Sequence, residues 1–216
     1  MNFLRRRLNS ADTTSQLDFI NSRPFPPDAF KVLFIGDSLM IHGQLKGVWD
    51  VSSGMAASRP ENDYVHLVSK GLQEEITRPA EALYNNGGNG RLREILEYIQ
   101  VRNLAPDMVI IQGGENDTFD RQFREYYPQL LDFYACPRIV LGDWFSKDKS
   151  DYSGSLCRER GLPFVNLCDI SADKQNSGWG GPYDRKDVAS HPNDSGHAAI
   201  AKGVLAKVKA MVLQNI

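Results

Sequence analysis

The alternation of short apolar runs with longer segments of helical periodicity constrains the fold more than any other feature of this sequence. Each run is three or four residues long and largely apolar, which is typical of a strand buried on both faces. The runs are residues 32–35, 82–84, 108–111, 138–141 and 163–165. They predict a five-stranded sheet.

The segments between the runs place apolar residues at intervals of three and four, the spacing of one face of an α-helix. The expected helices are residues 64–76, 91–101, 119–134, 153–160 and 196–213. Strands that alternate with helices indicate βαβ units, in which helices cover both faces of a mostly parallel sheet. We therefore predict an α/β protein, a three-layer α/β/α sandwich around a mostly parallel five-stranded sheet.

The chain of 216 residues is expected to form one main domain. Residues 1–30 are polar and rich in proline near their end, so we predict an N-terminal arm that is extended, with the domain spanning residues 31–216. Two long irregular stretches, residues 41–62 and 171–190, are expected to shape a site, because loops of this length are uncommon unless they are functional.

The formal net charge of −2 argues against a nucleic-acid partner, since binding to a phosphate backbone depends on clustered Lys and Arg. No stretch reaches the ~20 consecutive apolar residues of a membrane span. The N-terminus lacks the apolar core of a secretory signal, so we expect a cytoplasmic protein unless a signal has been removed. The three cysteines show no CxxC spacing and fit neither a disulfide framework nor a zinc site.

A glycine-flanked serine follows the first apolar run, in the order Gly36, Asp37, Ser38. In open α/β sheets ligands bind outside the carboxyl ends of the strands, so the Ser38 hydroxyl is expected to face the ligand. The pattern alone is not specific, because serine is common in turns and at helix N-caps. Ser38 is a candidate nucleophile, and a turn residue is the alternative.

A glycine-rich stretch, residues 85–91 (Asn-Asn-Gly-Gly-Asn-Gly-Arg), follows the second run and leads into a helix. Glycines allow sharp turns that present main-chain N–H groups at a helix start, where negative charge is favoured. A phosphate cradle would need the P-loop lysine or the G-x-G-x-x-G spacing, and the stretch has neither. The remaining interpretation is a donor to an oxyanion.

Two further polar blocks carry an asparagine and a histidine. Asn116, which follows two glycines closely, can donate its amide hydrogen to a developing oxyanion, or it can form an Asx-turn or a helix cap with Asp117. His191 directly precedes a proline and a helix start. It would supply what Ser38 lacks, because a serine hydroxyl is a weak nucleophile until an imidazole takes its proton.

Together the four blocks resemble the SGNH hydrolases, also called the GDSL esterases and lipases, whose invariant serine, glycine, asparagine and histidine occur in this order. The resemblance covers residue 31 to about residue 213. It implies a flavodoxin-like fold with Ser38 as the nucleophile, Gly90 and Asn116 in the oxyanion hole, and His191 as the base. The G-x-S-x-G elbow of the neighbouring α/β-hydrolases is absent around Ser38.

The acid of the expected triad departs from the family's Asp-x-x-His pattern, because Val188 stands three residues before His191. Asp187 can reach the imidazole through a turn that is longer by one residue, Asp184 can do so from further away, or a backbone carbonyl orients the ring in a Ser-His dyad. Asp187 is the candidate. Asp194 also lies nearby in sequence, but no metal site is expected, because the triad uses the same residues.

Three tryptophans, Trp49, Trp144 and Trp179, fall in segments expected at the crevice. Aromatic faces stack on sugar rings, whereas the alternative is that these side chains pack in the interior. We expect a serine esterase that removes short acyl groups, foremost O-acetyl groups, from a small-molecule or glycan substrate without a cofactor. The alternatives are a lipase or lysophospholipase, a glycan-binding protein without catalysis, and an O-acetyltransferase.

Overall fold

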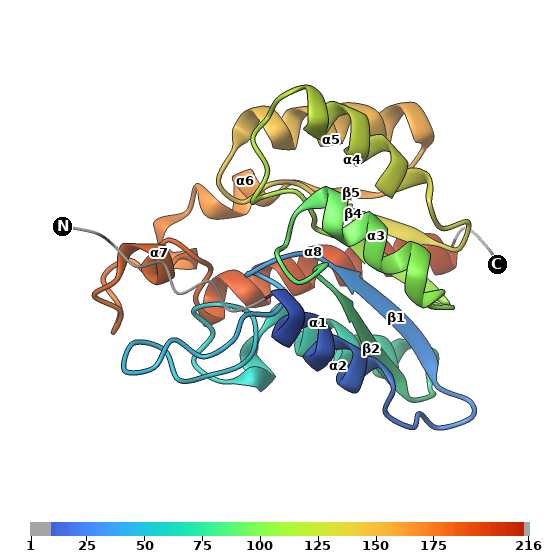
Figure 1. The fold of residues 1–216 in the computed structure, drawn as a ribbon, viewed down its shortest axis with the longest axis horizontal. Helices are drawn as coiled ribbons and strands as arrows, with labels where there is room; N and C mark the ends of the chain where they lie inside the picture. The colour runs from blue at the N-terminus through green and yellow to red at the C-terminus, as the bar shows by residue number, and fades with distance from the viewer. Residues whose placement is uncertain (1–9, 214–216) are drawn as a thin grey trace.

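The computed structural model describes residues 10–213 and contains a five-stranded parallel sheet (Figure 1). The strands are β1 (Phe30–Ile35), β2 (Ala80–Asn85), β3 (Met108–Ile111), β4 (Arg138–Leu141) and β5 (Phe164–Val165). Their order in the sheet is β2-β1-β3-β4-β5. Each predicted apolar run overlaps one of these strands, and the predicted α/β fold is confirmed.

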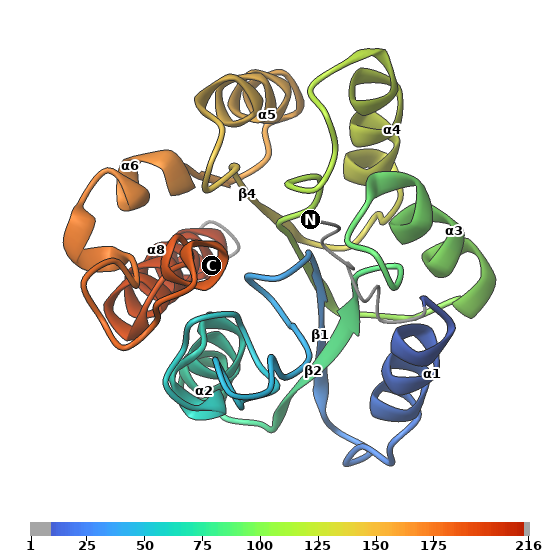
Figure 2. The same cartoon turned by 60° about the vertical axis from the view of Figure 1, so that its left-hand side comes forward.

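Helices cover both faces of the sheet, with α2 and α8 on one face and α1, α3 and α4 on the other (Figure 2). The α-helices are α1 (Ser10–Asn21), α2 (Tyr64–Ile76), α3 (Leu92–Arg102), α4 (Arg121–Asp132), α5 (Lys147–Arg160), α6 (Leu167–Ser171), α7 (Lys186–Ala189) and α8 (Asp194–Leu213). Short 3₁₀ helices lie at Pro60–Asn62 and Lys174–Asn176. The three layers are those of the predicted sandwich.

The register of the parallel strands brings three strand ends to one level. Ile35 at the end of β1 pairs with Asn85 at the end of β2 and with Ile111 at the end of β3. The segments that follow these residues therefore leave the sheet at the same edge. Three of the four blocks singled out in the sequence begin at this edge.

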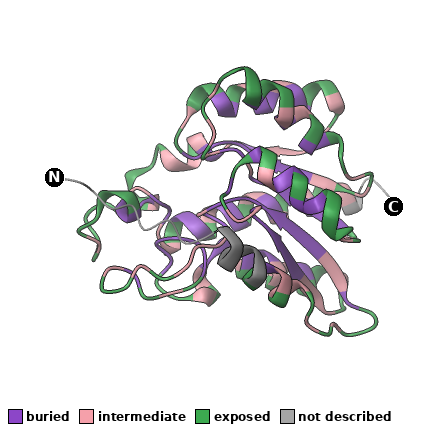
Figure 3. Ribbon diagram, viewed as in Figure 1, coloured by how far each residue is buried: buried purple, intermediate pink, exposed green. Residues whose placement is uncertain are grey.

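The core lies on both faces of the central strands, which are buried along most of their length (Figure 3). Leu72 of α2 packs in the core from one face, and Tyr127 of α4 packs from the other. Within residues 10–213, no helix is both long enough and apolar enough to cross a membrane.

Helix α1 corrects the prediction of an extended arm over residues 1–30. The chain is helical over Ser10–Asn21, and β1 begins at Phe30, one position before the predicted domain boundary. The apolar periodicity of this polar segment is weak, so the helix depends on tertiary contacts that the sequence pattern does not display. Residues 1–9 of the predicted arm lie outside the described residues.

The contacts of α1 close one edge of the sheet. Leu17 is buried in the core. Asn21 Nδ2 donates to the main-chain oxygen of Tyr84 at 2.8 Å, and Asn21 Oδ1 accepts from the main-chain amide of Tyr84 at 2.9 Å. Because β2 is an edge strand, these two bonds pair main-chain groups that no neighbouring strand reaches.

Helix α5 begins at Lys147, earlier than the predicted residue 153. The Ser146 hydroxyl accepts from the Lys149 amide and caps the helix. Lys149 and Ser150 are buried in the first turns, so polar residues occupy positions where the periodicity analysis looks for apolar ones.

Candidate active site

Ser38 lies in a tight turn directly after β1. The amides of Met40 and Ile41 both donate to the Asp37 carbonyl at 3.0 Å, so the chain makes a helical turn where it leaves the sheet. Gly36, which precedes this turn, is closely packed: a Cβ there would lie 2.5 Å from the Gln112 side-chain oxygen, so Gln112 would have to move. The turn leaves Ser38 half-buried at the carboxyl edge of the sheet.

His191 lies beside Ser38, although the two are far apart in the sequence. Ser38 Oγ and His191 Nε2 are 2.7 Å apart, and His191 Nδ1 is 2.6 Å from the main-chain oxygen of Asp187. A carbonyl only accepts hydrogen bonds, so Nδ1 carries the hydrogen and Nε2 is left to accept from the Ser38 hydroxyl. This is the tautomer that a base for Ser38 requires.

The Asp187 carboxylate pairs with Arg185 and not with His191. Its Oδ1 accepts from Arg185 Nε at 3.0 Å, and its Oδ2 binds the same guanidinium, which lowers the pKa of Asp187. In a helical turn the carbonyl of residue i lies beside residue i+4, whereas the side chain of residue i projects outward. The turn from α7 to His191 therefore brings the main-chain carbonyl of Asp187 to the imidazole, while the Asp187 carboxylate, the candidate acid, contacts Arg185 instead.

Of the three groups considered from the sequence, the main-chain carbonyl is the one that contacts His191 Nδ1 in the structure. Asp184 is exposed, and His191 Nδ1 already has the Asp187 carbonyl as its partner. The arrangement is a Ser-His pair oriented by the main chain.

Burial lowers the pKa of His191 to about 4, because the buried imidazole loses the hydration that stabilises its charged form. The Asp187 carbonyl opposes this shift, and the nearby His42 and His197 add to it. The ring is therefore neutral at neutral pH and can accept a proton there.

The glycine-rich stretch meets the other blocks at Gly90. Gly90 has φ of +67°, and a Cβ there would lie 2.5 Å from both Asn116 Nδ2 and Asp37 Cβ, so no other residue fits. Its own N–H donates to the Asn86 carbonyl at 2.6 Å. The Asn116 amide makes only a long bond of 3.4 Å to the Asn89 carbonyl, which leaves it loosely held beside the turn that carries Ser38.

Asp117, the neighbour of Asn116, has a structural role. Its Oδ2 accepts from the Leu92 amide at 3.0 Å and stabilises the start of α3. Of the two residues, Asp117 is therefore the one that bonds a helix start, while Asn116 is exposed at the carboxyl edge of the sheet.

No family model matches this sequence, and no curated protein matches it either. Solved structures do match the fold. The psychrotrophic esterase EstA from Pseudoalteromonas sp. aligns with a TM-score of 0.54 and 15% identity over 85% of this chain and 98% of its own. A lipolytic protein of the G-D-S-L family from Desulfitobacterium hafniense aligns with a TM-score of 0.54 and 14% identity, over 82% of this chain and 98% of its own.

A third structure, TesA, aligns with a TM-score of 0.53 and 14% identity over 83% of this chain and 98% of its own. The chain has the SGNH hydrolase fold. At these identities the likeness concerns the arrangement of helices and strands, and it agrees with the resemblance that the four sequence blocks carry.

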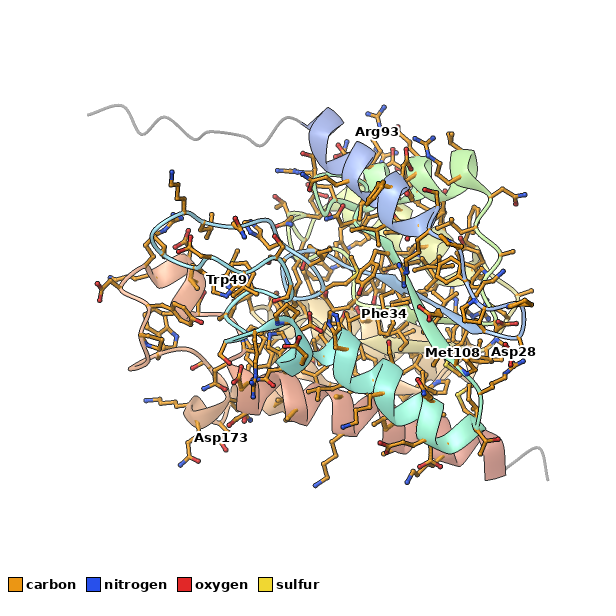
Figure 4. All side chains as sticks on the ribbon, turned by 90° about the horizontal axis from the view of Figure 1, so that it is seen from below. Asp28, Phe34, Trp49, Arg93, Met108 and Asp173 are labelled. Carbon is orange, nitrogen blue, oxygen red and sulfur yellow. The ribbon has the colours of Figure 1, made fainter. Side chains whose placement is uncertain are left out.

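Two of the three tryptophans considered for the crevice of this SGNH fold are buried, so for them the alternative of packing in the interior is the one observed. Trp49 and Trp144 are each 3% exposed. Trp49 Nε1 donates to the Ala57 carbonyl and Trp144 Nε1 to the Ser190 carbonyl, so both indoles are satisfied inside the protein. Figure 4 places Trp49 within the long loop that follows Ser38. Trp179 is 52% exposed.

Phe145 is the aromatic residue that contacts His191, and the sequence analysis missed it. The ring centroids are 5.2 Å apart in an edge-to-face arrangement, and Phe145 is 51% exposed. Phe145 comes shortly after β4, at the carboxyl edge of the sheet, and this position in the sequence could have indicated that it lies near the site.

The part of the chain described by the structure contains no group of three or more His, Cys, Asp or Glu side chains that could hold a metal ion. Asp194 instead accepts from the amide and hydroxyl of Ser58 and from the Asn62 amide. It ties the long loop to the start of α8.

Proposed function

We propose that this protein is a serine ester hydrolase in which Ser38 and His191 act as a catalytic dyad. The observation that carries the proposal is the 2.7 Å contact between Ser38 Oγ and His191 Nε2, with Nδ1 held by a carbonyl. The similarity in fold to the esterase EstA and to a G-D-S-L lipolytic protein supports it.

In the proposed mechanism, Ser38 Oγ attacks the acyl carbon while His191 Nε2 takes the hydroxyl proton. The imidazolium then gives this proton to the alcohol oxygen as the ester C–O bond breaks, which leaves an acyl-Ser38 and a free alcohol. Water attacks the acyl carbon in the second half-reaction, with His191 again as the base. The acid leaves and Ser38 regains its proton.

The oxyanion that forms in both steps needs hydrogen-bond donors. We assign this role to the main-chain amide of Ser38, the side-chain amide of Asn116 and the amide of Gly90. Use of Gly90 requires that its bond to the Asn86 carbonyl be shared or released. Loss of one such donor typically lowers turnover on the order of a hundredfold or more.

A fluorophosphonate probe tests the nucleophile directly. Incubation of the whole chain with the probe, followed by peptide mapping, is expected to find a single adduct on Ser38. The Ser38→Ala variant should remain unlabelled and inactive, whereas Ser69→Ala, a matched control on α2, should behave as the wild type. Labelling elsewhere, or full turnover by Ser38→Ala, would overturn the proposal.

We further propose that the acyl group is short and that the alcohol is a carbohydrate, so that O-acetyl sugars are the substrate class. The two buried tryptophans lend this no support. What supports it is the exposed Trp179 within the polar stretch that precedes His191, together with the exposed Phe145 ring beside the imidazole.

A panel of esters tests this narrower proposal. Rapid hydrolysis of p-nitrophenyl acetate but not of p-nitrophenyl octanoate, followed by acetate release from acetylated sugars, is the expected result. Preference for octanoate would favour a lipase or lysophospholipase instead. Acetyl transfer to a second sugar in place of hydrolysis would indicate a transferase, and sugar binding without turnover would indicate a binding protein.

A further inference from the structure

Two carboxyl groups lie buried behind the loops that carry Ser38 and Asn116. Asp37 directly precedes Ser38 and is 2% exposed. Glu115 directly precedes Asn116; its residue as a whole is half-buried, but its Oε2 is sealed from solvent. Neither Asp37 Oδ2 nor Glu115 Oε2 has a hydrogen-bond donor among the other side chains and main-chain groups described.

The second oxygen of each carboxyl is accounted for. Gln112 Nε2 donates to Asp37 Oδ1 at 3.4 Å, and the Trp144 amide donates to Glu115 Oε1 at 2.8 Å. The two unmatched oxygens belong to side chains within hydrogen-bond reach of each other. Two ionised carboxylates have no donor between them, whereas one proton would complete an O–H···O bond.

The surroundings make a second negative charge costly. Asp143 adds a third buried carboxylate, and Lys149 is the cation that faces this group, 3.3 Å from Asp143. Lys149 also donates to the main-chain oxygens of Gly114 and Glu115, at 2.9 and 3.0 Å. Lys149 thus interacts with both Asp143 and the loop, and among residues 10–213 neither Asp37 nor Glu115 forms an ion pair.

Tyr64 of α2 faces the same region: burial raises its pKa, and the charges of Asp63, Asp37 and Glu115 raise it further. Burial raises the pKa of both carboxyls, and the charges of Asp37 and Asp143 raise that of Glu115 further. The protonated form is therefore favoured well above the pH at which a carboxyl ordinarily ionises.

We propose that Asp37 and Glu115 share one proton, and that the resulting hydrogen bond positions Ser38 against Asn116. This inference rests on the proposed esterase function, in which these two neighbours are the nucleophile and an oxyanion donor. The bond joins the loop after β1 to the loop after β3 at the level where both leave the sheet. Asp37 and Glu115 are thus positioning residues that do not touch the substrate.

The first test compares Glu115→Gln with Glu115→Leu. A glutamine amide can donate to Asp37 and accept from the Trp144 amide, as a protonated glutamic acid does, whereas leucine can do neither. We expect Glu115→Gln to keep near wild-type kcat at pH 7. Glu115→Leu should lose kcat on the order of tenfold or more with little change in KM, since misplaced catalytic groups slow the chemical step.

The pH profile separates this role from a merely structural one. As the pH rises from 6 to 10, the wild type should lose kcat when the shared proton leaves, while Glu115→Gln should keep it. The matched control is Glu125→Gln on the exposed side of α4, which should follow the wild-type profile. Loss of activity in Glu115→Gln equal to that in Glu115→Leu, or an unchanged alkaline profile, would overturn the proposal.

Measuring Tm as a function of pH tests the shared proton independently of catalytic activity. A carboxyl whose pKa is raised by folding loses its stabilising effect as the pH rises through that pKa. The Tm of the wild type should therefore fall relative to that of Glu115→Gln as the pH rises, and a Tm difference that stays constant with pH would contradict the shared proton. If the phosphonate labels nothing but this Tm difference still changes with pH, the esterase proposal fails while the carboxyl pair stands.

Discussion

At the scale of single residues, the group that orients His191 is a main-chain carbonyl, which no side-chain substitution at Asp187 removes. The backbone of α7 positions this oxygen, and the hydrogen bond from His191 Nδ1 to it sets the orientation of the imidazole. Substitutions that keep the turn should therefore leave the base in place.

Replacing Asp187 with alanine is expected to lower kcat/KM less than about tenfold, whereas loss of a true triad carboxylate costs on the order of 10⁴. The Arg185→Ala variant is the matched control, because it breaks the same exposed ion pair from the other side. Steady-state kinetics on a short-chain ester make the comparison. A loss near 10⁴ in Asp187→Ala alone would show that the carboxylate orients the ring in solution.

The acidic side of the pH profile follows from the buried imidazole. His191 has a pKa of about 4, below the ordinary histidine value, so it stays unprotonated and active as the pH falls through 6. We expect kcat/KM to decline only as the pH approaches 4, which a profile between pH 3.5 and 8 will reveal. Half-maximal activity near pH 6.5 would mean that the ring is better solvated than the structure indicates.

A comparison of Gly90 with Gly161 distinguishes the effect of backbone strain from the effect of a steric clash in the site. Gly90→Ala and Gly161→Ala both place a Cβ on a residue with positive φ, which costs roughly 1–2 kcal/mol of stability. At Gly161 the added atom meets nothing within 4 Å, whereas at Gly90 it collides with Asn116 and Asp37. Urea unfolding should show a loss for both variants, while kcat should fall on the order of a hundredfold only for Gly90→Ala.

At the scale of elements, the sequence predicts those whose local signals agree with their packing. Helix α2 has the predicted bounds, because Asp63 caps its first turn and an apolar face repeats along it. Helix α5 begins before the predicted residue, because the buried side chains of its first turns are polar and give no apolar periodicity. Helix α1 was not predicted, since contacts with β2 stabilise it more than any pattern of its own.

Asn21 is the residue whose removal tests that account of α1. Asn21→Ala deletes both hydrogen bonds to Tyr84 on the edge strand and should lower the free energy of unfolding by about 1–3 kcal/mol. Activity should persist, because neither Asn21 nor Tyr84 is among the proposed catalytic or oxyanion-binding residues. Ser22→Ala removes only an exposed local bond to Phe19 and is the control. Equal stability of the two variants would contradict a role for α1 in closing the edge.

At the scale of the whole molecule, the aligned strand ends explain why four short blocks could predict a site. Ser38, Gly90 and Asn116 follow three neighbouring strands, and parallel topology alone brings such positions together. The orienting group of His191, the contact with Phe145 and the pairing of Asp37 with Glu115 depend on side-chain directions and turn geometry, which periodicity and spacing do not encode.

Val188 occupies the position where the usual pattern would have its acid, and its side chain is fully buried against the cluster of Trp49, Met55 and Ala56. An aspartate engineered there would place a carboxylate in this apolar cluster and would weaken its packing against the loop that follows Ser38. Adding a carboxylate to the proposed Ser-His dyad at this position would therefore require other contacts to hold the loop. Val188 thus stands where the usual pattern has an acid, and its side chain packs α7 against the loop that follows Ser38.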